Sequence, residues 1–536
     1  MSATAGRAGA AEAGAAEASA GPDDQREVVA FLSRPDTWGP EVASVERRET
    51  HASHLFLAGT KAWKLKRAVR YPYLDYSTAA RRRHFCEAEV EVNRPAAGGL
   101  YRGVVPVVRT PAGGLAVGGE GTPVDWLVEM ERFDEDALFD HLAGQGRLDR
   151  LAMESLADTV AEFHREAERR PDAGGAAGVE ATLAGNRGCF AQADPKILDR
   201  ARTEELVARS AALFAAVAPL LDRRRDEGFV RRCHGDLHLR NIVALDGRAV
   251  LFDAIEFEPA FAEIDVLYDL AFLVMDLYFR DLGRLGSILL NRYLDNTGDA
   301  AGLATLPLFL AMRAAIRAHV DAAAAGALSL PDEAAVLAAA AGRYLDLALA
   351  CTRPAEPRLI AIGGLSGAGK SRLARELAPC LGPAPGARVV RTDSTRKRLA
   401  GVSLETRLAP RDYSEAASRR TYAAAFDEAR LALAAGLPVI ADAVFAKPDE
   451  RAEIEAVAAE FGVPFRGLWL ETAPRVMEQR VTDRVRNVSD AGPEVVRLQL
   501  AYDVGTIGWT RMDSSGAGGA TLQAAADALG LETIRA

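Results

Sequence analysis

The spacing of apolar residues divides the chain into stretches of different character. In the first, from residue 26 to about 101, short alternating runs predict strands, and a longer polar stretch predicts a helix that ends at the breakers Pro95 and Gly98. The expected elements are strands at 55–57, 62–66, 104–108 and 126–130 and a helix from Thr78 to Asn93. These elements would form a small sheet with one helix packed on it.

The second stretch, from 137 to about 351, has apolar residues at three- and four-residue spacings and therefore predicts helices. One loop-and-strand insert, 233–257, interrupts it. Beyond this stretch, strand-like and helical runs alternate, which predicts a parallel sheet wrapped by helices. The expected division is a disordered tail at 1–25, one domain at 26–351, a proline-containing linker at 352–357 and a second domain at 358–536.

Composition and charge narrow the class of protein. The 536 residues exceed what one hydrophobic core organises, and 49% apolar with 26% charged residues is typical of globular proteins. The net charge of −10 argues against a dedicated nucleic-acid binder and favours a small-molecule substrate, for which a cation would fit.

Cysteine usage and the lengths of the apolar segments indicate the compartment of the protein. The five cysteines are scattered without a C-x-x-C pair, which indicates a reducing compartment. The first 21 residues lack the unbroken apolar core of a signal peptide, and the apolar run 267–279 is too short to cross a bilayer. We therefore expect a cytoplasmic protein that does not contact membranes.

A phosphate-binding motif opens the last stretch. The letters G-L-S-G-A-G-K-S match G-x-x-x-x-G-K-[ST] between an apolar strand and a helical run. Backbone N–H groups of the loop would surround ATP phosphates, Lys370 would reach the terminal phosphates and Ser371 would bind Mg²⁺. Asp442, which ends a strand, would hold Mg²⁺ through water or else cap the next turn. The predicted nucleotide-binding loop comprises Gly364, Leu365, Ser366, Gly367, Ala368, Gly369, Lys370 and Ser371.

The segment 391–401 resembles the second-strand motif of small P-loop kinases such as gluconate kinases, polynucleotide kinases and zeta toxins. The resemblance implies that Asp393 contacts or deprotonates the acceptor hydroxyl; the alternative is that Asp393 caps the helix that follows. Arg480 and Arg484, one turn apart on a predicted helix, look like lid arginines that neutralise charge on the transferred phosphoryl group. The alternative is a solvated basic helix face.

A second signature lies in the insert, where 234–241 fits the kinase catalytic loop H-x-D-L-x-x-x-N. In this spacing Asp236 can accept the proton of a substrate hydroxyl, while Asn241 turns back to bind Mg²⁺. Asp253 ends the strand 249–252, where a second Mg²⁺ ligand is expected. Because H-G-D replaces H-R-D and D-A-I-E follows the strand in place of D-F-G, the segment resembles the aminoglycoside phosphotransferase and choline-kinase branch.

That resemblance implies a lysine and a carboxylate upstream. Lys64, in the letters K-A-W-K, would bind the ATP phosphates, and strand alternation leaves Lys66 as a rival on the same face. The acidic partner on the following helix would be Glu87, with Glu91 as second choice.

The nucleotide base would lie at the hinge between lobes. The segment 126–131 resembles this hinge, whose backbone binds adenine, and this places Met130 at the nucleotide; the alternative is an ordinary half-buried strand. No G-x-G-x-x-G loop covers the phosphates, and 50–54 stands in its place.

The order of the two halves, with the motif 71–78 between the lysines and the helix, resembles the bacterial proteins described as bifunctional aminoglycoside phosphotransferase/ATP-binding proteins. The resemblance implies an α+β protein-kinase-like bilobal domain followed by an α/β P-loop NTPase domain with a parallel sheet. It also implies ATP and Mg²⁺ as cofactors and phosphoryl transfer to a small-molecule hydroxyl. The acceptor is not fixed: Glu256, Glu258 and Glu263 would suit a cationic aminoglycoside or solvent equally.

Two other interpretations stay open. In one, a module only binds ATP and regulates the other module; the intact set of Asp236, Asn241 and Asp253 argues against an inactive first module. In the other, the C-terminal module is a zeta-toxin-like or nucleic-acid-end kinase, which the basic residues 396–398 favour and the net acidity opposes. The sequence predicts no oligomeric state.

Overall fold

The computed structural model describes residues 23–71, 74–328, 330–483 and 488–531, so the tail expected at 1–25 lies almost entirely outside it. The chain forms two compact units that do not follow chain order. The first unit combines Met1–Gly146 with His234–Ala262, and the second combines Arg147–Cys233 with Glu263–Ala536. The insert with the catalytic-loop motif therefore belongs to the same unit as the N-terminal sheet, and the C-terminal domain shares a unit with the helical stretch before it.

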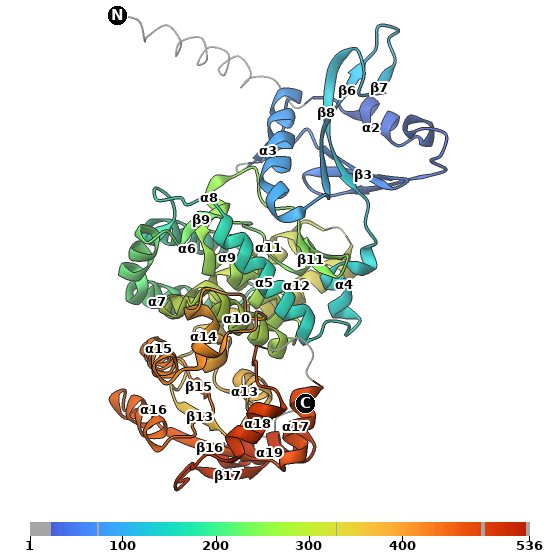
Figure 1. Cartoon of the computed structure of the whole chain (residues 1–536). Helices are drawn as coiled ribbons and strands as arrows, with labels where there is room; N and C mark the ends of the chain where they lie inside the picture. Colours follow the sequence, from blue (N-terminus) through green and yellow to red (C-terminus); the bar gives the residue numbers. More distant parts are fainter. Residues whose placement is uncertain (1–22, 72–73, 329, 484–487, 532–536) are drawn as a thin grey trace, which may run out of the picture. The chain divides into compact units, whose positions relative to one another are not determined.

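The first unit is built on an antiparallel sheet of six strands in the order β1-β2-β3-β8-β6-β7. Alternation along β2 gives each face its own core: Phe56 points to a cluster with Val28 and Leu32 of α2, whereas Leu57 joins a cluster with Cys86 and Val90 of α3. The elements are β1 (Val45–Glu49), β2 (Ser53–Ala58), β3 (Lys61–Lys66), β6 (Tyr101–Arg109), β7 (Leu115–Val117), β8 (Thr122–Glu131), α2 (Arg26–Leu32), η1 (Pro35–Trp38), α3 (Ala79–Ala97), β4 (Arg70–Tyr71) and β5 (Leu74–Asp75). Figure 1 shows α3 lying along this sheet.

Helix α3 corrects one expected boundary. It starts where the sequence predicts, with Thr78 as N-cap, but it continues through Pro95 to Ala97. A proline so near the C-terminus removes only one backbone hydrogen bond of the helix. The helix ends instead at Gly98, whose φ of 53° favours glycine.

The remaining part of the first unit carries the catalytic-loop motif. The strands β10 and β11 form an antiparallel hairpin whose turn residues, Asp246 and Gly247, both have positive φ. This hairpin follows the motif directly and ends at Leu251; the next N–H, of Phe252, donates to the Asn241 carbonyl oxygen at 3.0 Å, so Asp253 lies close to the motif. The elements are η2 (Glu135–Ala137), α4 (Phe139–Gly144), η3 (Leu239–Asn241), β10 (Ile242–Leu245), β11 (Arg248–Leu251) and α8 (Pro259–Ala262).

The second unit begins with a helical part, as the apolar spacing predicts. Its helices are α5 (Arg150–Glu166), α6 (Gly175–Gln192), α7 (Arg200–Asp226), α9 (Val266–Phe279), α10 (Gly283–Thr297), α11 (Leu306–Ala327) and α12 (Pro331–Cys351), with η4 (Ala300–Thr305) and the antiparallel pair β9 (Val230–Arg232) and β12 (Glu263–Asp265). In the described chain, two helical stretches, Ala300–Ala327 and Pro331–Cys351, are long and apolar enough to span a membrane by length and composition alone. Within the first of these, 72% of the apolar window is buried inside the protein, as in a core helix.

The rest of the second unit is a parallel sheet in the order β14-β15-β13-β16-β17, which confirms the predicted P-loop NTPase fold. The strands are β13 (Leu359–Gly363), β14 (Arg388–Arg391), β15 (Val439–Asp442), β16 (Phe465–Glu471) and β17 (Thr510–Asp513). The helices are α13 (Lys370–Leu377), η5 (Ala378–Cys380), α14 (Thr392–Leu399), η6 (Pro410–Tyr413), α15 (Glu415–Ala434), α16 (Pro448–Glu460), α17 (Pro474–Thr482), α18 (Pro493–Leu500) and α19 (Gly518–Leu529).

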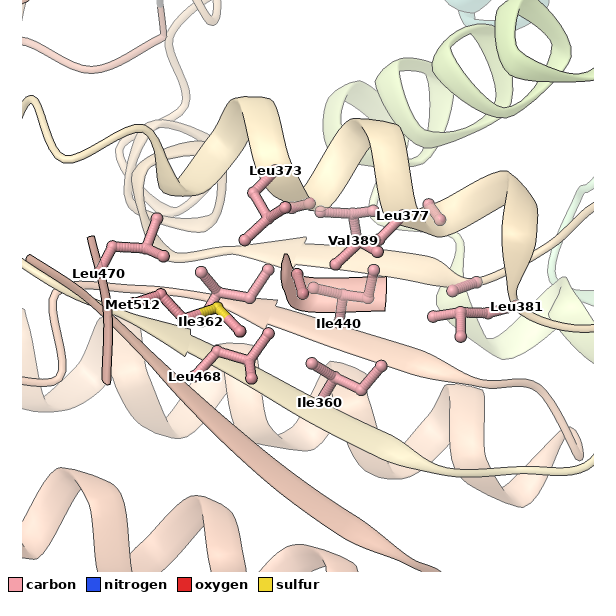
Figure 2. Packing of buried hydrophobic residues seen from close by; sticks show 14 of the residues in the cluster. Ile360, Ile362, Leu373, Leu377, Leu381, Val389, Ile440, Leu468, Leu470 and Met512 are labelled. Atoms are coloured by element: carbon pink, nitrogen blue, oxygen red, sulfur yellow. The ribbon is translucent and has the colours of Figure 1, made fainter. Parts of the chain in front are cut away.

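The core of this sheet fixes helix α13, the first element after the phosphate-binding loop. Figure 2 shows Leu373 and Leu377 of α13 directed toward Ile362, Ile440 and Val389 of three neighbouring strands. These side chains are buried, and each fully buried aliphatic side chain contributes about 1.5–3 kcal/mol. The N-terminus of α13 is thereby held at the carboxyl ends of the strands, where ligands of such sheets bind.

Candidate functional site

In the first unit, the catalytic loop joins Asp236 to Asn241. The amide nitrogen of Asn241 donates to the Asp236 carboxylate at 3.0 Å and to its backbone oxygen at 2.9 Å. The amide oxygen of Asn241 is then the atom that can bind a cation. Gly235 has a φ of 83°, and a Cβ there would lie 2.8 Å from the Phe261 carbonyl oxygen, so the loop requires glycine at this position.

Asp253 sits in a strained backbone conformation at the end of the hairpin. Its φ is 62°, a left-handed value that non-glycine residues rarely adopt. Two side chains hold the backbone here: the Asp253 N–H donates to the Tyr101 hydroxyl at 3.1 Å, and the next N–H donates to the Asn93 side chain at 2.9 Å. Strain held in place by such contacts is typical of functional sites. The predicted second Mg²⁺ ligand is thus fixed against the N-terminal sheet.

The lysine predicted to bind phosphate meets Asp253 directly. The Lys64 ammonium lies 2.6 Å from the Asp253 carboxylate and 2.9 Å from the carboxylate of Glu89. Lys66, on the same face of β3, lies 2.7 Å from the other oxygen of Glu89. Burial alone would raise the pKa of Glu89, but the ammonium groups of Lys64 and Lys66 lower it to about 2. Likewise, burial opposes the charge of Lys64 while the carboxylates of Asp253 and Glu89 raise the pKa of Lys64 well above its ordinary value.

The acidic partner predicted at Glu87 is wrong: the partner is Glu89. Glu87 is exposed and pairs with Arg83 on the same helix. The reason is the phase of α3, because the buried stripe of this helix runs through Arg82, Cys86, Glu89 and Asn93 at three- and four-residue spacings. Helical spacing counted from Cys86 could therefore have identified Glu89 from the sequence.

One acidic residue suggested for a cationic substrate has a different partner. The Glu256 carboxylate contacts the Lys66 ammonium and accepts a hydrogen bond from the Tyr76 hydroxyl at 2.6 Å. It therefore belongs to a cluster of Lys64, Lys66, Glu89, Asp253 and Glu256, called here the lysine cluster. Neither Tyr76 nor Tyr101 was singled out by the sequence, because both reach the site through long-range contacts.

Met130 lies in β8 with a buried side chain in the cluster beneath α3. Its backbone is aligned with Ala62 of β3 on one side and with Tyr101 of β6 on the other. Its contact with adenine stays a prediction.

In the second unit, the phosphate-binding loop has the conformation that its glycines predict. Gly364, Gly367 and Gly369 have φ values of 135°, 87° and 98°. A Cβ at Gly364 would lie 2.6 Å from the Leu470 carbonyl oxygen, and one at Gly367 would lie 2.7 Å from the Met477 carbonyl oxygen. The chain fits a cradle of N–H groups for phosphate only with glycine at these positions.

Side chains on either side of the loop complete its surroundings. Lys370 donates to the Leu365 carbonyl oxygen at 3.1 Å and so bends back over the loop, while Ser371 lies in the first turn of α13. Gln499 of α18, which the sequence did not reveal, accepts a hydrogen bond from the Ser366 N–H at 2.7 Å. Asp442 ends β15, beside Ile362 of β13, where a carboxylate and the Ser371 hydroxyl can supply oxygen ligands to a divalent cation.

The predicted lid arginine Arg480 lies close to the loop. It donates to the Ser514 carbonyl oxygen at 2.8 Å, and a longer contact of 3.5 Å reaches the Gly367 carbonyl oxygen. Helix α17 ends at Thr482, and Arg484 lies outside the described residues.

Asp393 lies in the first turn of α14 and lines the same cavity as Lys370, Asp442 and Arg480. Asp393 is the acidic residue of the first turn of α14, a position where a carboxylate also stabilises the helix, so the acceptor role and the helix-end role both stay predictions. The cavity has a volume of about 1220 Å³. That exceeds the roughly 300–1,000 Å³ typical of a site for one small molecule, so a nucleotide and an acceptor can share it.

Among the described residues, one further buried group has metal-ligand types: His164, Cys233 and Asp269, with ligand atoms within 4.8 Å of one another. The two ring nitrogens of His164 already contact the Tyr293 hydroxyl at 2.9 Å and Asp269 at 3.1 Å. The group therefore joins α5, α9 and α10 internally.

Comparison with known families identifies both modules. Residues 76–306 match the model of the phosphotransferase enzyme family (APH), and residues 359–502 match the model of an AAA domain (AAA_33). Together with the folds, these matches define the chain as a kinase with two nucleotide-binding domains, and they confirm the predicted fusion.

Relatives that align with most of this chain show the family to which it belongs. The chain is 30% identical over 486 residues to the uncharacterized protein Rv2004c of Mycobacterium tuberculosis, which covers 88% of this chain and 93% of the relative. The uncharacterized protein Mb2027c of Mycobacterium bovis matches with the same identity and coverage. The chain belongs to the family of these mycobacterial proteins.

Solved structures resemble each part separately. A choline/ethanolamine kinase family protein from Mesorhizobium loti aligns with 61% of this chain and 98% of its own, at 14% identity and a TM-score of 0.37. A gluconokinase from Sinorhizobium meliloti aligns with 33% of this chain and 93% of its own, at 18% identity and a TM-score of 0.25.

Proposed function

We propose that the first module transfers the γ-phosphoryl group of ATP to the hydroxyl of a small molecule. The observation that supports this most is the joint placement of the Asp236–Asn241 pair and of Asp253, which is held at a strained φ beside Lys64. In this proposal the acceptor oxygen forms a bond to the γ-phosphorus while the bond from that phosphorus to the oxygen of ADP breaks. The proton of the acceptor hydroxyl passes to the Asp236 carboxylate.

The other residues of this module would bind and orient ATP and Mg²⁺. Lys64 would contact the ATP phosphates; Glu89 pairs with Lys64 directly and with Lys66, and Glu256 pairs with Lys66. Asn241 and Asp253 offer oxygen ligands for Mg²⁺, which would neutralise phosphate charge when bound. Met130 would contact adenine through its backbone.

We also propose that the P-loop module is a second kinase. Lys370 and the loop would bind the phosphates, Ser371 and Asp442 would hold Mg²⁺, and Arg480 would stabilise the transferred group. Asp393, which lines the same cavity, would accept the proton of the acceptor hydroxyl. This observation favours a kinase over a pure ATP-binding regulator, because a regulator needs no carboxylate at the acceptor side.

Two broader elements of the proposal come from composition. A cytoplasmic location without membrane contact is part of the proposal, supported by the burial of 72% of the apolar window within Ala300–Ala327. A cationic acceptor for the first module remains the preferred class, although Glu256 no longer supports it because it pairs with Lys66. A zeta-toxin-like or nucleic-acid-end kinase is the alternative for the second module.

The test is ATP turnover by the full chain against panels of aminoglycosides, sugars, amino alcohols and nucleotides. Asp236→Asn and Lys370→Met each disable one module while keeping side-chain volume close to the original. A substrate whose turnover is abolished by Asp236→Asn alone belongs to the first module, and one abolished by Lys370→Met alone belongs to the second. If no acceptor-dependent turnover in any panel responds to Asp236→Asn, the proposed role of the first module is wrong.

A further inference from the structure

Three arginines around the cavity of the P-loop module are incompletely paired. Arg375, Arg391 and Arg396 all line this cavity; the buried Nε atoms of Arg375 and Arg396 have no hydrogen-bond partner among the described residues, and the buried Nε of Arg391 has only an ion-pair contact of 3.4 Å with Asp442. A buried guanidinium N–H without a partner is costly, so a ligand that supplies a hydrogen-bond acceptor there would be bound favourably. We call these three residues the arginine cluster.

Arg375 is the least compensated member. No acidic side chain of the described residues lies within 4 Å of its guanidinium group, and it sits on α13, one turn beyond Ser371. Burial, with Arg391 and Arg150 nearby, lowers the pKa of Arg375 to about 10, although the more distant carboxylates of Glu154 and Asp442 act in the opposite direction. Two neighbouring guanidinium groups that repel each other in a buried wall are stabilised when an anion enters between them.

The other two members belong to the acceptor side of the cavity. Arg391 ends β14 and Arg396 lies in α14, so they flank Asp393 in the same segment. Strand β13 leads into the phosphate-binding loop. In the sheet, β15 lies between β13 and β14. Arg391 lies 3.4 Å from Asp442, and Arg396 lies 4.8 Å over the ring of Tyr413.

The phosphates of ATP have other ligands. The glycine loop, Lys370 and Arg480 surround the start of α13, and Arg480 is tied to Ser514 there. The arginine cluster is thus additional positive charge, next to the carboxylate proposed to activate the acceptor. Guanidinium groups match the geometry of phosphate, sulfate and carboxylate.

We propose that the acceptor of the P-loop module is an alcohol that also carries an anionic group, a phosphate, sulfate or carboxylate, and that Arg375, Arg391 and Arg396 bind this group. The inference rests on the proposed kinase function of this module and specifies its substrate class. The hydroxyl of the acceptor would face Asp393, and its anionic group would be held by the cluster. The transfer itself is unchanged: the γ-phosphoryl group moves to the hydroxyl oxygen and the proton moves to Asp393.

The first experiment measures binding of inorganic sulfate to the full chain saturated with Mg²⁺ and AMP-PNP, by calorimetry, against sodium chloride at equal ionic strength. Sulfate is expected to bind while the nucleotide is bound. Arg375→Met and Arg391→Met should each weaken sulfate binding about 10-fold or more, because a hydrogen bond to a charged group contributes about 1.5–3 kcal/mol. Arg375→Met should leave AMP-PNP affinity unchanged, and Arg375→Lys should restore part of the sulfate affinity.

Arg430→Met is the matched control, since Arg430 is a surface residue of the same domain that pairs with Glu460 and does not line the cavity. It should bind sulfate like the unaltered chain. If sulfate does not bind once AMP-PNP is present, or if Arg375→Met weakens AMP-PNP as much as sulfate, the cluster serves the nucleotide and the inference is overturned. Circular dichroism confirms that each variant is folded.

A second experiment separates this inference from the proposed function. In an Asp236→Asn background, ADP release is measured with matched alcohols: glycerol with glycerol 3-phosphate, and glucose with gluconate. The expected result is Lys370-dependent turnover of anionic members only, with a KM for the alcohol raised about 10-fold by Arg375→Met and an unchanged KM for ATP. Equal turnover of the neutral members would overturn the inference while supporting the kinase function. Absence of all turnover would count against the kinase function, and the sulfate result would still decide the role of the cluster.

Discussion

Ser394, the residue after Asp393, donates a hydrogen bond to Asp295 at 2.7 Å, although the two residues lie in different family-matched domains. Asp295 belongs to α10 of the helical part, is 3% exposed, and also lies 2.7 Å from Arg388 of β14. Arg388 in turn contacts Glu428 of α15. The segment that carries the proposed acceptor base is therefore built partly on the helical part of the same compact unit.

Asn291, one turn before Asp295, strengthens this connection. Its side-chain oxygen accepts from the Val389 N–H at 2.8 Å and from Arg388 at 2.9 Å, and its nitrogen donates to the Ala387 carbonyl oxygen at 3.2 Å. A side chain thus pairs with the edge strand β14 where another strand would otherwise lie. An edge strand covered in this way is protected from pairing with other chains.

We predict that Asp295→Ala destabilises the second unit strongly. It leaves Arg388 with one buried partner fewer, and breaking a buried charge pair typically costs about 3–5 kcal/mol. Urea unfolding, followed by far-UV circular dichroism, measures the change. Asp346→Ala is the control, because the Asp346–Arg202 pair is exposed and should contribute about 0–1 kcal/mol. Equal effects of the two substitutions would contradict the proposed importance of this contact.

The lysine cluster gives a second prediction, which separates Glu89 from Glu87. Glu89→Gln removes the charge that balances two buried lysines, so it should lower the free energy of unfolding by about 3–5 kcal/mol and abolish nucleotide binding by the first module. Glu87→Gln removes one exposed partner of Arg83 and should change stability by less than about 1 kcal/mol. Denaturant unfolding and AMP-PNP titration of a Lys370→Met background measure both effects. Matching behaviour of the two variants would show that Glu89 has no special role.

His319 gives a prediction on pH. Its ring contacts Asn186 at 3.1 Å, and burial lowers the pKa of His319 to about 4. The unfolded chain binds a proton near pH 6.5 and the folded chain only near 4, so stability falls as the pH drops through this window. His319→Gln keeps a hydrogen-bond donor and removes the titration, and it should reduce the loss between pH 6.5 and 4 by about 1–3 kcal/mol. An unchanged slope of unfolding free energy against pH would refute the assignment.

The phosphate-binding loop gives a prediction on backbone geometry. Gly367→Ala places a Cβ 2.7 Å from the Met477 carbonyl oxygen at a φ of 87°, so it should distort the loop and weaken AMP-PNP binding by the P-loop module about 10-fold or more. Gly508→Ala meets no atom within 4 Å and should bind nucleotide normally. Calorimetric titration in an Asp253→Asn background isolates this module. Normal affinity of the Gly367 variant would mean that the loop tolerates a side chain there.

Local signals in the sequence predicted much of both sites. The glycine loop and the catalytic loop each lie within eight residues, and in the structure Asn241 contacts Asp236 while Lys370 contacts the loop carbonyl of Leu365. Their roles toward Mg²⁺ and phosphate stay predictions. Strand alternation placed Lys64 and Lys66 on one face, as the shared contact with Glu89 confirms. The prediction of Glu87 was wrong because the buried stripe of α3 has a helical phase that turns Glu89 inward and Glu87 to the surface.

Other features depend on contacts that no local pattern encodes. Ser394 and Asp295 are 99 residues apart, and Gln499 reaches the loop residue Ser366 from 133 residues away. The insert that holds Asp236 lies in the same compact unit as a sheet formed more than a hundred residues earlier, so the two compact units cut across the linear order of domains. Such contacts follow from the packing of whole elements, which the sequence does not state residue by residue.

The measurement that tests the central claim most directly is the stoichiometry of AMP-PNP binding to the full chain with Mg²⁺, by isothermal titration calorimetry. Two functional nucleotide-binding modules predict two sites in the unaltered chain and one site in either single variant, Lys370→Met or Asp253→Asn. They predict none in the double variant. Asparagine is chosen at 253 because it tolerates the left-handed backbone found there. A single site that Asp253→Asn leaves intact would contradict the account, since the first module would then bind no nucleotide.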